Sequence, residues 1–399
     1  MSNRALNILA VMLVVAMASL AFIAGYFFND YVEARPATNS HIAANDDEFA
    51  IFWEAWNWVE KSFIGELPTP REVAYGAIRG ALTTLEDPYT VFIEPVVRQQ
   101  EIDSLRGNFG GVGATISRLE TGEVVLEPIP GNPAEEAGIL SGDILLAVDG
   151  VAISAEMSVE DIANIVRGER GTEVILTVIH PETTESVDIT IVRDDILIPS
   201  VAYRLLEEDQ TIGYIWLTRF SGESNSEIEV AMQTLQAQGA TRLILDLRGN
   251  GGGLLDAAVA IADQFLEDGI IMHQESALEG TKTYSATAGM VAGEMPVVVL
   301  IDGGTASASE ILAGALQDRG RAILMGQQSF GKGSVQLVYD LSDGSSVHVT
   351  SARWFTPDRN EIDQHGLTPD VVVEPSAEAL ANNRDETLAR AVEYLQNGE

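Results

Sequence analysis

The carboxyl-terminal half of the chain alternates between short apolar runs and longer segments with an apolar residue at every third or fourth position. The runs predict strands, and the longer period predicts helices with one buried face. This alternation favours a largely parallel sheet flanked by helices, an α/β architecture. The strands are expected at residues 212–217, 243–247, 297–301 and 322–325, and the helices at residues 226–238, 254–266 and 309–318.

Residues 104–195 show a second pattern, made of short alternating strands. Ser158 and Asp161 fit the spacing of a capping box, which satisfies the first free N–H groups of a helix, here one that ends at Val166. These features indicate a small α+β domain inserted ahead of the α/β core. Its strands are expected at residues 123–126, 142–150, 174–179 and 187–192, with a short helix at residues 131–138.

The amino-terminal segment carries an uncharged stretch of 23 residues, 6–28. A helix of this length crosses a hydrocarbon core of about 30 Å. Arg4 precedes the stretch and acidic residues follow it, so the positive-inside bias keeps the N-terminus in the cytoplasm and the remaining chain outside. The apolar core of a cleaved signal peptide is shorter, which favours a retained anchor over residues 1–29 and a linker over residues 30–45. Cleavage within residues 34–37 remains the alternative.

Residues 46–103 are predicted to form an N-terminal helical region, with a second helix at residues 71–85. Three tryptophans, Trp53, Trp56 and Trp58, exceed what one helix face needs for its own core. Two interpretations stay open: packing onto the next helix, or a surface for dimerisation.

Residues 376–399 close the chain, with one amphipathic helix predicted over residues 376–396. Its apolar line is formed by Leu380, Leu388, Val392 and Leu395. This helix is expected either to fold back on its own domain or to contribute to a dimer interface.

Composition limits the number of domains, the partners and the chemistry that the chain can have. The 399-residue chain is 46% hydrophobic, which is enough for two or three buried cores. Its net charge of −37 disfavours nucleic acid and anionic membrane surfaces as partners. It has no cysteine, so disulfides, thiolate metal sites and thiol nucleophiles are excluded. No His-Glu-x-x-His motif or comparable cluster occurs, so neither a metal nor another cofactor is expected.

The strongest chemical signal lies in residues 302–336. Ser307 is placed at a predicted strand-to-helix corner, where unpaired N–H groups of the helix N-terminus can stabilise an oxyanion. Lys332 lies between two glycines in an apolar neighbourhood, and desolvation there would lower its pKa toward that of a general base. We therefore hypothesise that Ser307 and Lys332 act as a pair.

The sequence Thr-Ala-Ser-Ala-Ser-Glu-Ile at residues 305–311, followed by Phe-Gly-Lys-Gly-Ser-Val-Gln at residues 330–336, resembles the carboxyl-terminal processing proteases, serine peptidases of family S41 with a Ser-Lys pair. The resemblance extends from about residue 46 to the C-terminus. It implies that Ser307 is the nucleophile, Lys332 the base and Gln336 the residue that positions the lysine. Thr305 stands where the family often has serine.

The resemblance also implies that residues 196–375 form a protease core with the fold shared by crotonases and Clp-type peptidases. In that family a glycine-rich corner, here residues 246–253, supplies one N–H of the oxyanion hole. We expect Gly252 in this role, with Gly251 as the near alternative, and Ala308 as the second donor.

Residues 132–145 resemble the PDZ domains of bacterial proteases. Such a domain adds an extended peptide to a sheet edge and holds its terminal carboxylate on clustered N–H groups. The glycine-rich loop expected at residues 109–113 fits this task because its backbone permits close approach. Arg167 either reports an occupied groove to the protease core or is a solvated surface charge. The expected substrate-binding residues are Phe109, Gly110, Gly111, Val112 and Arg167.

Three rival motifs are weaker. Residues 326–332 nearly spell a P-loop, but Gly333 replaces the hydroxyl that binds Mg²⁺ and a strand follows instead of a helix. Residues 329–332 fit Ser-x-x-Lys of penicillin-recognising enzymes, although glycines disfavour the helix that motif needs. A Ser-His-Asp triad would need His348 or His365, and nothing spaces either of them against Ser307.

The sequence thus predicts a single-pass membrane protein whose catalytic part is extracytoplasmic. It would be a serine endopeptidase that cleaves unfolded or tail-exposed proteins from or near their C-termini, selects apolar tails through its PDZ domain, and forms a homodimer. The other class left open is a membrane-tethered binding module on the same fold that no longer cleaves.

Overall fold

The computed structural model describes residues 46–287 and 290–398. The predicted membrane span at residues 6–28 and the linker at residues 30–45 lie outside this part. Within the described residues, no helix combines the length and apolarity needed to cross a bilayer. The chain divides after Gly76 into two units, which we describe separately.

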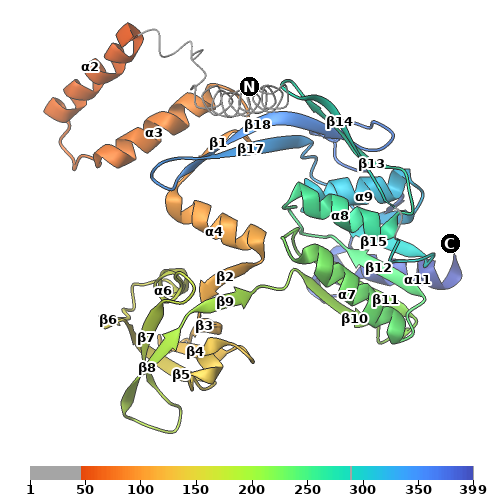
Figure 1. Cartoon of the computed structure of the whole chain (residues 1–399), viewed down its shortest axis with the longest axis horizontal. Coiled ribbons are helices and arrows are strands. Elements are labelled where there is room, and N and C mark those ends of the chain that lie inside the picture. Colours follow the sequence, from red (N-terminus) through yellow and green to blue (C-terminus); the bar gives the residue numbers. More distant parts are fainter. Residues whose placement is uncertain (1–45, 288–289, 399) are drawn as a thin grey trace, which may run out of the picture. The chain divides into compact units, whose positions relative to one another are not determined.

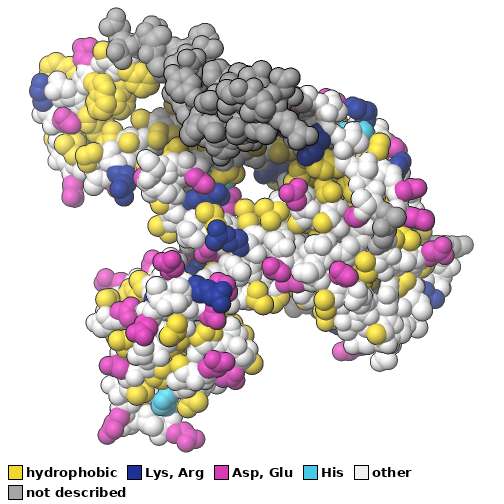
Figure 2. All heavy atoms as spheres, viewed as in Figure 1, with side chains coloured by type: hydrophobic (Ala, Val, Ile, Leu, Met, Phe, Trp, Pro, Cys, Tyr) yellow, Lys and Arg dark blue, Asp and Glu magenta, His cyan; other side chains and the backbone are white. Residues whose placement is uncertain are grey.

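The first unit contains the predicted N-terminal helices, α2 (Asp46–Ser62) and the start of α3 (Pro70–Thr83). The N–H of Thr69 donates to Glu72 Oε2 at 2.6 Å, and the N–H of Glu72 donates back to the Thr69 hydroxyl at 3.3 Å, so α3 begins with reciprocal caps. Trp53 and Trp58 on α2 are each 62% exposed. Hydrophobic side chains gather on the surface of α2 in Figure 2.

The α/β core is built on a six-stranded sheet (Figure 1). Its order is β10-β11-β12-β15-β16-β19, and all neighbours are parallel except the edge pair β10 and β11. The predicted strands and helices are therefore confirmed. Their bounds are β10 (Val201–Leu205), β11 (Ile212–Leu217), α7 (Ser224–Ala237), β12 (Arg242–Asp246), α8 (Leu255–Phe265), β15 (Val297–Ile301), α9 (Ala308–Asp318), β16 (Ala322–Gly326) and β19 (Val371–Val372).

A second, antiparallel sheet accompanies this core, and most of it was not predicted. Its long strand β18 pairs with β1, β13 and β17, and β13 pairs further with β14. Side chains of α8, α9 and β13 share one apolar core with the parallel sheet. The bounds are β1 (Val91–Ile93), β13 (Ile270–Ser276), β14 (Gly280–Ser285), β17 (Ser334–Asp340) and β18 (Ser346–Phe355).

The α+β domain closes around its own core of buried aliphatic side chains. Its sheet has the order β3-β4-β5-β7-β8, and β6 pairs with β5. The capping box at Ser158 and Asp161 is confirmed at the start of α6. The bounds are β3 (Ala114–Arg118), β4 (Val124–Pro128), α5 (Pro133–Glu136), β5 (Asp143–Val148), β6 (Val151–Ala152), α6 (Val159–Val166), β7 (Glu173–Ile179) and β8 (Ser186–Val192).

The entry and exit of this domain form a neck. The predicted glycine loop at residues 109–113 is instead largely a strand, β2 (Asn108–Gly111), paired antiparallel with β9 (Asp194–Leu197). Helix α4 (Pro95–Arg106) leads into the neck; most of it lies in the helical region predicted over residues 46–103, although its own bounds were not predicted. Next to it, the N–H of Ile198 donates to the carbonyl of Gly107 at 2.9 Å. Gly110 and Gly111 were interpreted as part of a loop because β9, the strand that pairs with them, is distant in sequence.

The single C-terminal helix predicted over residues 376–396 is wrong, because two helices occupy this segment. They are α10 (Ala377–Ala381) and α11 (Glu386–Asn397). Asn383 between them has φ of 51°, which ends the first helix, and the Asp385 side chain accepts the Leu388 N–H at 2.9 Å to start the second. Leu388, Val392 and Leu395 pack with the parallel sheet, so α11 folds back on its own domain.

Candidate active site

Ser307 lies at the predicted corner, directly before the first residue of α9. Its backbone has φ of 57° and ψ of −117°, a strained conformation for a residue with a side chain. Such strain clusters at functional sites, where the surrounding structure enforces it. The side chain is half-buried and faces the start of a helix.

The glycine-rich corner after β12 is hydrogen-bonded to the serine corner through Asn250. The carbonyl of this fully buried residue accepts the N–H of Ala306 at 3.0 Å and the hydroxyl of Ser309 at 2.8 Å. Its side-chain amide donates to the carbonyl of Leu217 at 2.8 Å. Asn250 therefore fixes the distance between the two loops that flank Ser307.

Gly252 lies against the nucleophile corner as expected. Its φ is 104°, and a Cβ built on it would lie 3.0 Å from the Cβ of Ser307 and 3.0 Å from the N of Ala308. However, the N–H of Gly252 donates to Asn250 Oδ1 at 2.9 Å. The N–H groups of Gly251 and Ala308 have no acceptor in the described part of the chain. In this state the free N–H groups are those of Gly251, the near alternative, and Ala308.

Lys332 lies on the loop between β16 and β17. Burial lowers the pKa of its ammonium, in the predicted direction, while Glu101 and Glu310 raise it in part. Its Nζ lies 5.1 Å from the centroid of the Tyr89 ring. Across the described residues no hydrogen bond joins this nitrogen to the Ser307 hydroxyl. In this structure the amine of Lys332 and the hydroxyl of Ser307, the pair hypothesised from the sequence, are therefore not hydrogen-bonded to each other.

Glu310 joins the two segments. It is fully buried in the first turn of α9, and its Oε2 accepts the N–H of Ser307 at 2.8 Å and the N–H of Lys332 at 2.9 Å. Its Oε1 accepts the hydroxyl of Ser329 at 2.6 Å and the N–H of Gly331 at 2.7 Å. One carboxylate thus holds the backbones of both candidate catalytic residues.

Gln336 lies on β17, four residues beyond Lys332. Its amide nitrogen donates to the hydroxyls of Ser334 at 2.9 Å and Thr350 at 3.4 Å. No hydrogen bond to the Lys332 amine is present among the residues that the structure describes. The positioning role predicted for Gln336 therefore stays a prediction.

The described histidines do not form a triad with Ser307. His348 lies 3.2 Å from Glu101, and His365 contacts the carbonyl of Asp363 at 2.7 Å. His180 pairs with a carboxylate of the inserted domain, and His273 contacts a threonine hydroxyl. Over residues 46–287 and 290–398, no group of three or more His, Asp or Glu side chains is arranged to hold a metal ion.

The inserted domain carries an apolar groove of about 250 Å³ between β3 and α6. Phe109, Gly111, Val112 and Arg167 line it, as predicted for a peptide site. Gly110 does not line the groove. A Cβ on Gly110 would lie 2.1 Å from the carbonyl oxygen of Gly168, so this glycine permits close approach of two backbone segments.

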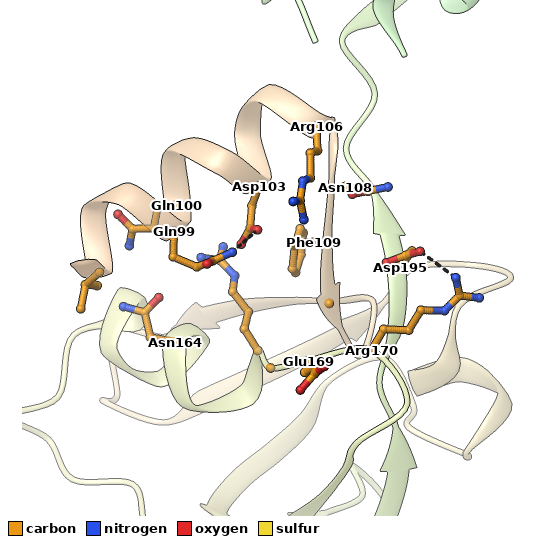
Figure 3. A pocket seen from close by; sticks show the side chains of 14 residues that line it. Gln99, Gln100, Asp103, Arg106, Asn108, Phe109, Asn164, Glu169, Arg170 and Asp195 are labelled. Atoms are coloured by element: carbon orange, nitrogen blue, oxygen red, sulfur yellow. Dashed lines mark hydrogen bonds and ion pairs between the residues drawn. The ribbon is translucent and has the colours of Figure 1, made fainter. Parts of the chain in front are cut away.

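A second hollow of about 630 Å³ lies between α4 and the same domain (Figure 3). The guanidinium of Arg167 stacks 4.8 Å from the centroid of the Phe109 ring, and both residues line both hollows. Most of the other side chains that line the second hollow are polar, and Arg170 is bonded to Asp195 there at 3.0 Å. Arg167 is therefore a half-buried residue that separates the groove from the second hollow, and it is not a freely solvated charge.

Sequence reasoning missed Tyr89, Asn250 and the contacts that Glu310 makes outside its own helix. Glu310 had a readable signal, because Ser307 and Glu310 have the spacing of a capping box. Tyr89 follows Asp-Pro in a turn before β1, and nothing in that sequence points to Lys332. The contact of Tyr89 with Lys332 depends on tertiary structure alone.

Two segments of the chain match models of known protein families. The family model for peptidase family S41 matches residues 211–373, and a PDZ domain model matches residues 124–179. A carboxyl-terminal-processing protease of Picosynechococcus is 38% identical, covering 86% of this chain and 88% of that protein. The CtpA protease of Bacillus subtilis is 32% identical over 90% of this chain and 75% of that protein.

A solved structure, the photosystem II D1 C-terminal processing protease, is 33% identical, covers 82% of this chain and 93% of that chain, and has a TM-score of 0.46. The two family models and the curated relatives define the molecule as a serine peptidase with a PDZ domain. The chain belongs to the carboxyl-terminal processing proteases of peptidase family S41.

Proposed function

We propose that Ser307 and Lys332 form the catalytic pair of this C-terminal processing peptidase. The observation that carries the proposal is the shared acceptor: Oε2 of Glu310 receives the N–H groups of both residues. Desolvation of Lys332, which favours the neutral amine, is the second support. No cofactor takes part.

In the proposed reaction the neutral amine of Lys332 removes the proton of the Ser307 hydroxyl, and the resulting alkoxide attacks the scissile carbonyl. The N–H of Ala308, together with that of Gly251 or Gly252, stabilises the tetrahedral oxyanion. The ammonium then protonates the leaving amine as the C–N bond breaks. A water molecule, deprotonated by the same lysine, hydrolyses the ester and releases the acyl product.

This reaction requires the side chain of Lys332 to turn from Tyr89 to Ser307. Its four methylene groups supply that reach while the backbone stays bound to Glu310. In the proposed active state Gln336 leaves Ser334 and Thr350 and orients the amine.

The pair is tested by incubating the purified full-length chain with an unfolded protein and reading the product C-termini by mass spectrometry. Ser307→Ala and Lys332→Ala are each expected to lose cleavage by about 10³-fold or more. Ser226→Ala and Lys282→Ala, which alter exposed positions, serve as matched controls. Cleavage by Lys332→Ala at the wild-type rate would refute the proposal.

We further propose that the groove between β3 and α6 binds apolar C-terminal tails of substrates. Its dimensions and its lining by Val112 and Ala163 support this. Ala163→Phe fills the groove and is expected to abolish binding of a free-carboxylate peptide, while hydrolysis of a small ester substrate persists. Equal binding of the amidated peptide by the wild-type chain would contradict recognition of the terminal carboxylate.

The uncharged stretch at residues 6–28 supports a proposed anchor, with the peptidase on the extracytoplasmic side. The full chain is expected to stay in membranes after alkaline carbonate extraction, and a chain lacking residues 1–29 to be released. Digestion of intact spheroplasts by an added protease should remove the peptidase. Protection of the peptidase would reverse the orientation.

The exposed tryptophans of α2 support a proposed homodimer. The double variant Trp53→Ser, Trp58→Ser is expected to halve the mass measured by light scattering, because each substitution removes a large apolar contact from the interface. Val230→Ser, at an exposed apolar position on α7, is the control. An unchanged mass in the double variant would remove α2 from the interface.

A further inference from the structure

The carboxylate of Glu310 makes more bonds than its helix requires. In a capping box the carboxylate at the third helical position accepts one hydrogen bond, from the N–H of the residue before the helix. Glu310 makes that bond to Ser307 and adds three more, all from residues 329–332. No lysine or arginine side chain bonds to it within the described residues, although it is fully buried. Helix capping alone does not explain this arrangement.

The energetics support a second task. Burying a carboxylate without a counter-charge is costly, and charge-assisted hydrogen bonds are what offset the cost. Here the donors come from two loops that are separated in sequence by α9 and β16. The free energy that stabilises the carboxylate therefore also holds the two loops together.

The lysine loop is held from the other side as well. A Cβ on Gly331 would lie 2.8 Å from the N of Gly366, and one on Gly333 would lie 2.5 Å from the N of Asp363. The indole N–H of Trp354 also donates to the carbonyl of Lys332 at 3.0 Å. The backbone at Lys332 is thus fixed on both sides, and its side chain is the part left to move.

We propose that Glu310 is a positioning residue that sets the separation of Ser307 and Lys332 by accepting both backbone N–H groups on one oxygen atom. This inference rests on the proposed catalytic pair. Glu310 touches neither the substrate nor the reacting atoms. It acts by keeping the Ser307 hydroxyl within reach of the Lys332 amine as the lysine side chain changes rotamer.

Glu310 also has an electrostatic effect of known sign. Its charge raises the pKa of Lys332 against the larger, lowering effect of burial. Removal of the charge should let the lysine lose its proton at lower pH. A role confined to folding would not move the pH profile in this direction.

The test measures acylation of Ser307 by a p-nitrophenyl ester, followed as the burst of released p-nitrophenolate, as a function of pH, using the full-length chain. Glu310→Gln keeps the size of the side chain but cannot accept four donors. It is expected to lower the plateau rate about 10- to 100-fold, the loss that follows from misplacing a reacting pair. The midpoint of its profile is expected at lower pH. Glu310→Asp keeps the charge but is shorter, so its plateau should fall while its midpoint stays.

Two controls separate positioning from stability. Ser329→Ala removes one donor to Glu310 without touching either amide, and it is expected to acylate within about threefold of wild type despite a similar loss in Tm. Glu227→Gln alters a carboxylate that accepts the Ser200 N–H at 2.7 Å at the start of another helix, and it should leave the profile unchanged.

The proposal is overturned if Glu310→Gln keeps the wild-type plateau and midpoint, or if Ser329→Ala loses as much rate as Glu310→Gln at equal Tm. Should Glu310→Gln fail to fold, the Glu310→Asp plateau decides alone. Lys332→Ala is measured alongside. If that variant acylates at the full rate, the catalytic pair itself is wrong, an outcome distinct from failure of the Glu310 assignment.

Discussion

The amine of Lys332 lies over the face of Tyr89, with Nζ 5.1 Å from the ring centroid. The negative face of an aromatic ring attracts an ammonium and not a neutral amine, so this contact favours protonated Lys332, the form that cannot act as the proposed base. Tyr89→Leu should therefore move the pH profile of Ser307 acylation to lower pH. Below the wild-type midpoint its rate should rise about two- to fivefold.

Tyr89→Phe keeps the ring and should keep the profile. The matched control is Tyr284→Leu, since Lys282 lies 4.3 Å from the Tyr284 centroid in a pair that plays no part in the site. A midpoint in Tyr89→Leu that moves to higher pH would show that the ring acts mainly by desolvation.

Lys332 should also make stability depend on pH. Its folded-state pKa is lowered by burial, so the unfolded chain binds more protons between that pKa and the ordinary value of 10.5. Stability consequently rises with pH across this window. Lys332→Met should raise Tm at pH 7 by about 1 to 3 °C, and the gain should shrink as the pH approaches the ordinary value. Thermal unfolding of the full chain is the measurement.

Lys282→Met is the control for this series, because Lys282 is exposed and its pKa is raised by the nearby Tyr284. It should show no gain in Tm at neutral pH. A gain for Lys332→Met that persisted unchanged to alkaline pH would mean that packing, not charge, causes it.

The ion pair of Arg248 with Asp385 should hold α11 in place. Two hydrogen bonds of 2.8 and 2.7 Å join them. Burial alone would raise the pKa of Asp385, but the bonds from Arg248 and from the Leu388 N–H lower it overall. The pair therefore adds stability above the ordinary aspartate pKa of 3.8, and this is lost as pH falls through the folded-state value.

Asp385→Ala should accordingly cost about 1 kcal/mol at pH 7, a modest figure because the Asp385 side chain is 40% exposed. Hydrogen exchange of the α11 amides should accelerate in this variant and converge with wild type in acid. Glu393→Gln, at an exposed i, i+3 pair, should exchange normally. Equal protection of α11 in both variants would argue against the anchoring role.

Gly110→Ala should damage the neck of the PDZ domain. The added Cβ would lie 2.1 Å from the Gly168 carbonyl oxygen, which is backbone and cannot turn aside. We expect a loss of about 1 to 3 kcal/mol in the stability of this domain and weaker peptide binding. Gly80→Ala, on α3 with no atom within 4 Å, should be neutral or stabilising by up to about 1 kcal/mol. Unaltered peptide affinity in Gly110→Ala would exclude the neck from recognition.

The parallel core was predictable because its strands are apolar throughout. All five residues of β15 are buried, and such runs stand out without knowledge of their neighbours. The strand β14 was not predictable, since five of its six residues are exposed and its pairing with β13 alone defines it. The same reason explains β2, whose glycines resemble a loop until β9 pairs with them.

In the candidate site, Ser307 and Lys332 were singled out because glycines and a strand-to-helix corner mark them locally, and their catalytic role stays a prediction. The contacts that join them were not readable. Glu310 bonds to residues that follow a whole helix and strand, and Tyr89 comes from a segment before the inserted domain. Gly252 was the expected oxyanion donor. The sequence does not show that its N–H donates instead to the side-chain oxygen of Asn250.

The neck of the inserted domain has a consequence for how this protein can change over evolution. The chain leaves the core at Gly107 and returns at Ile198, and one hydrogen bond joins these two positions. Because departure and return are adjacent, the core closes without help from the ninety residues between them. Recombination that exchanges this module for another domain would preserve the peptidase scaffold, so the substrate recognition proposed for this module can diversify independently of the hydrolytic chemistry.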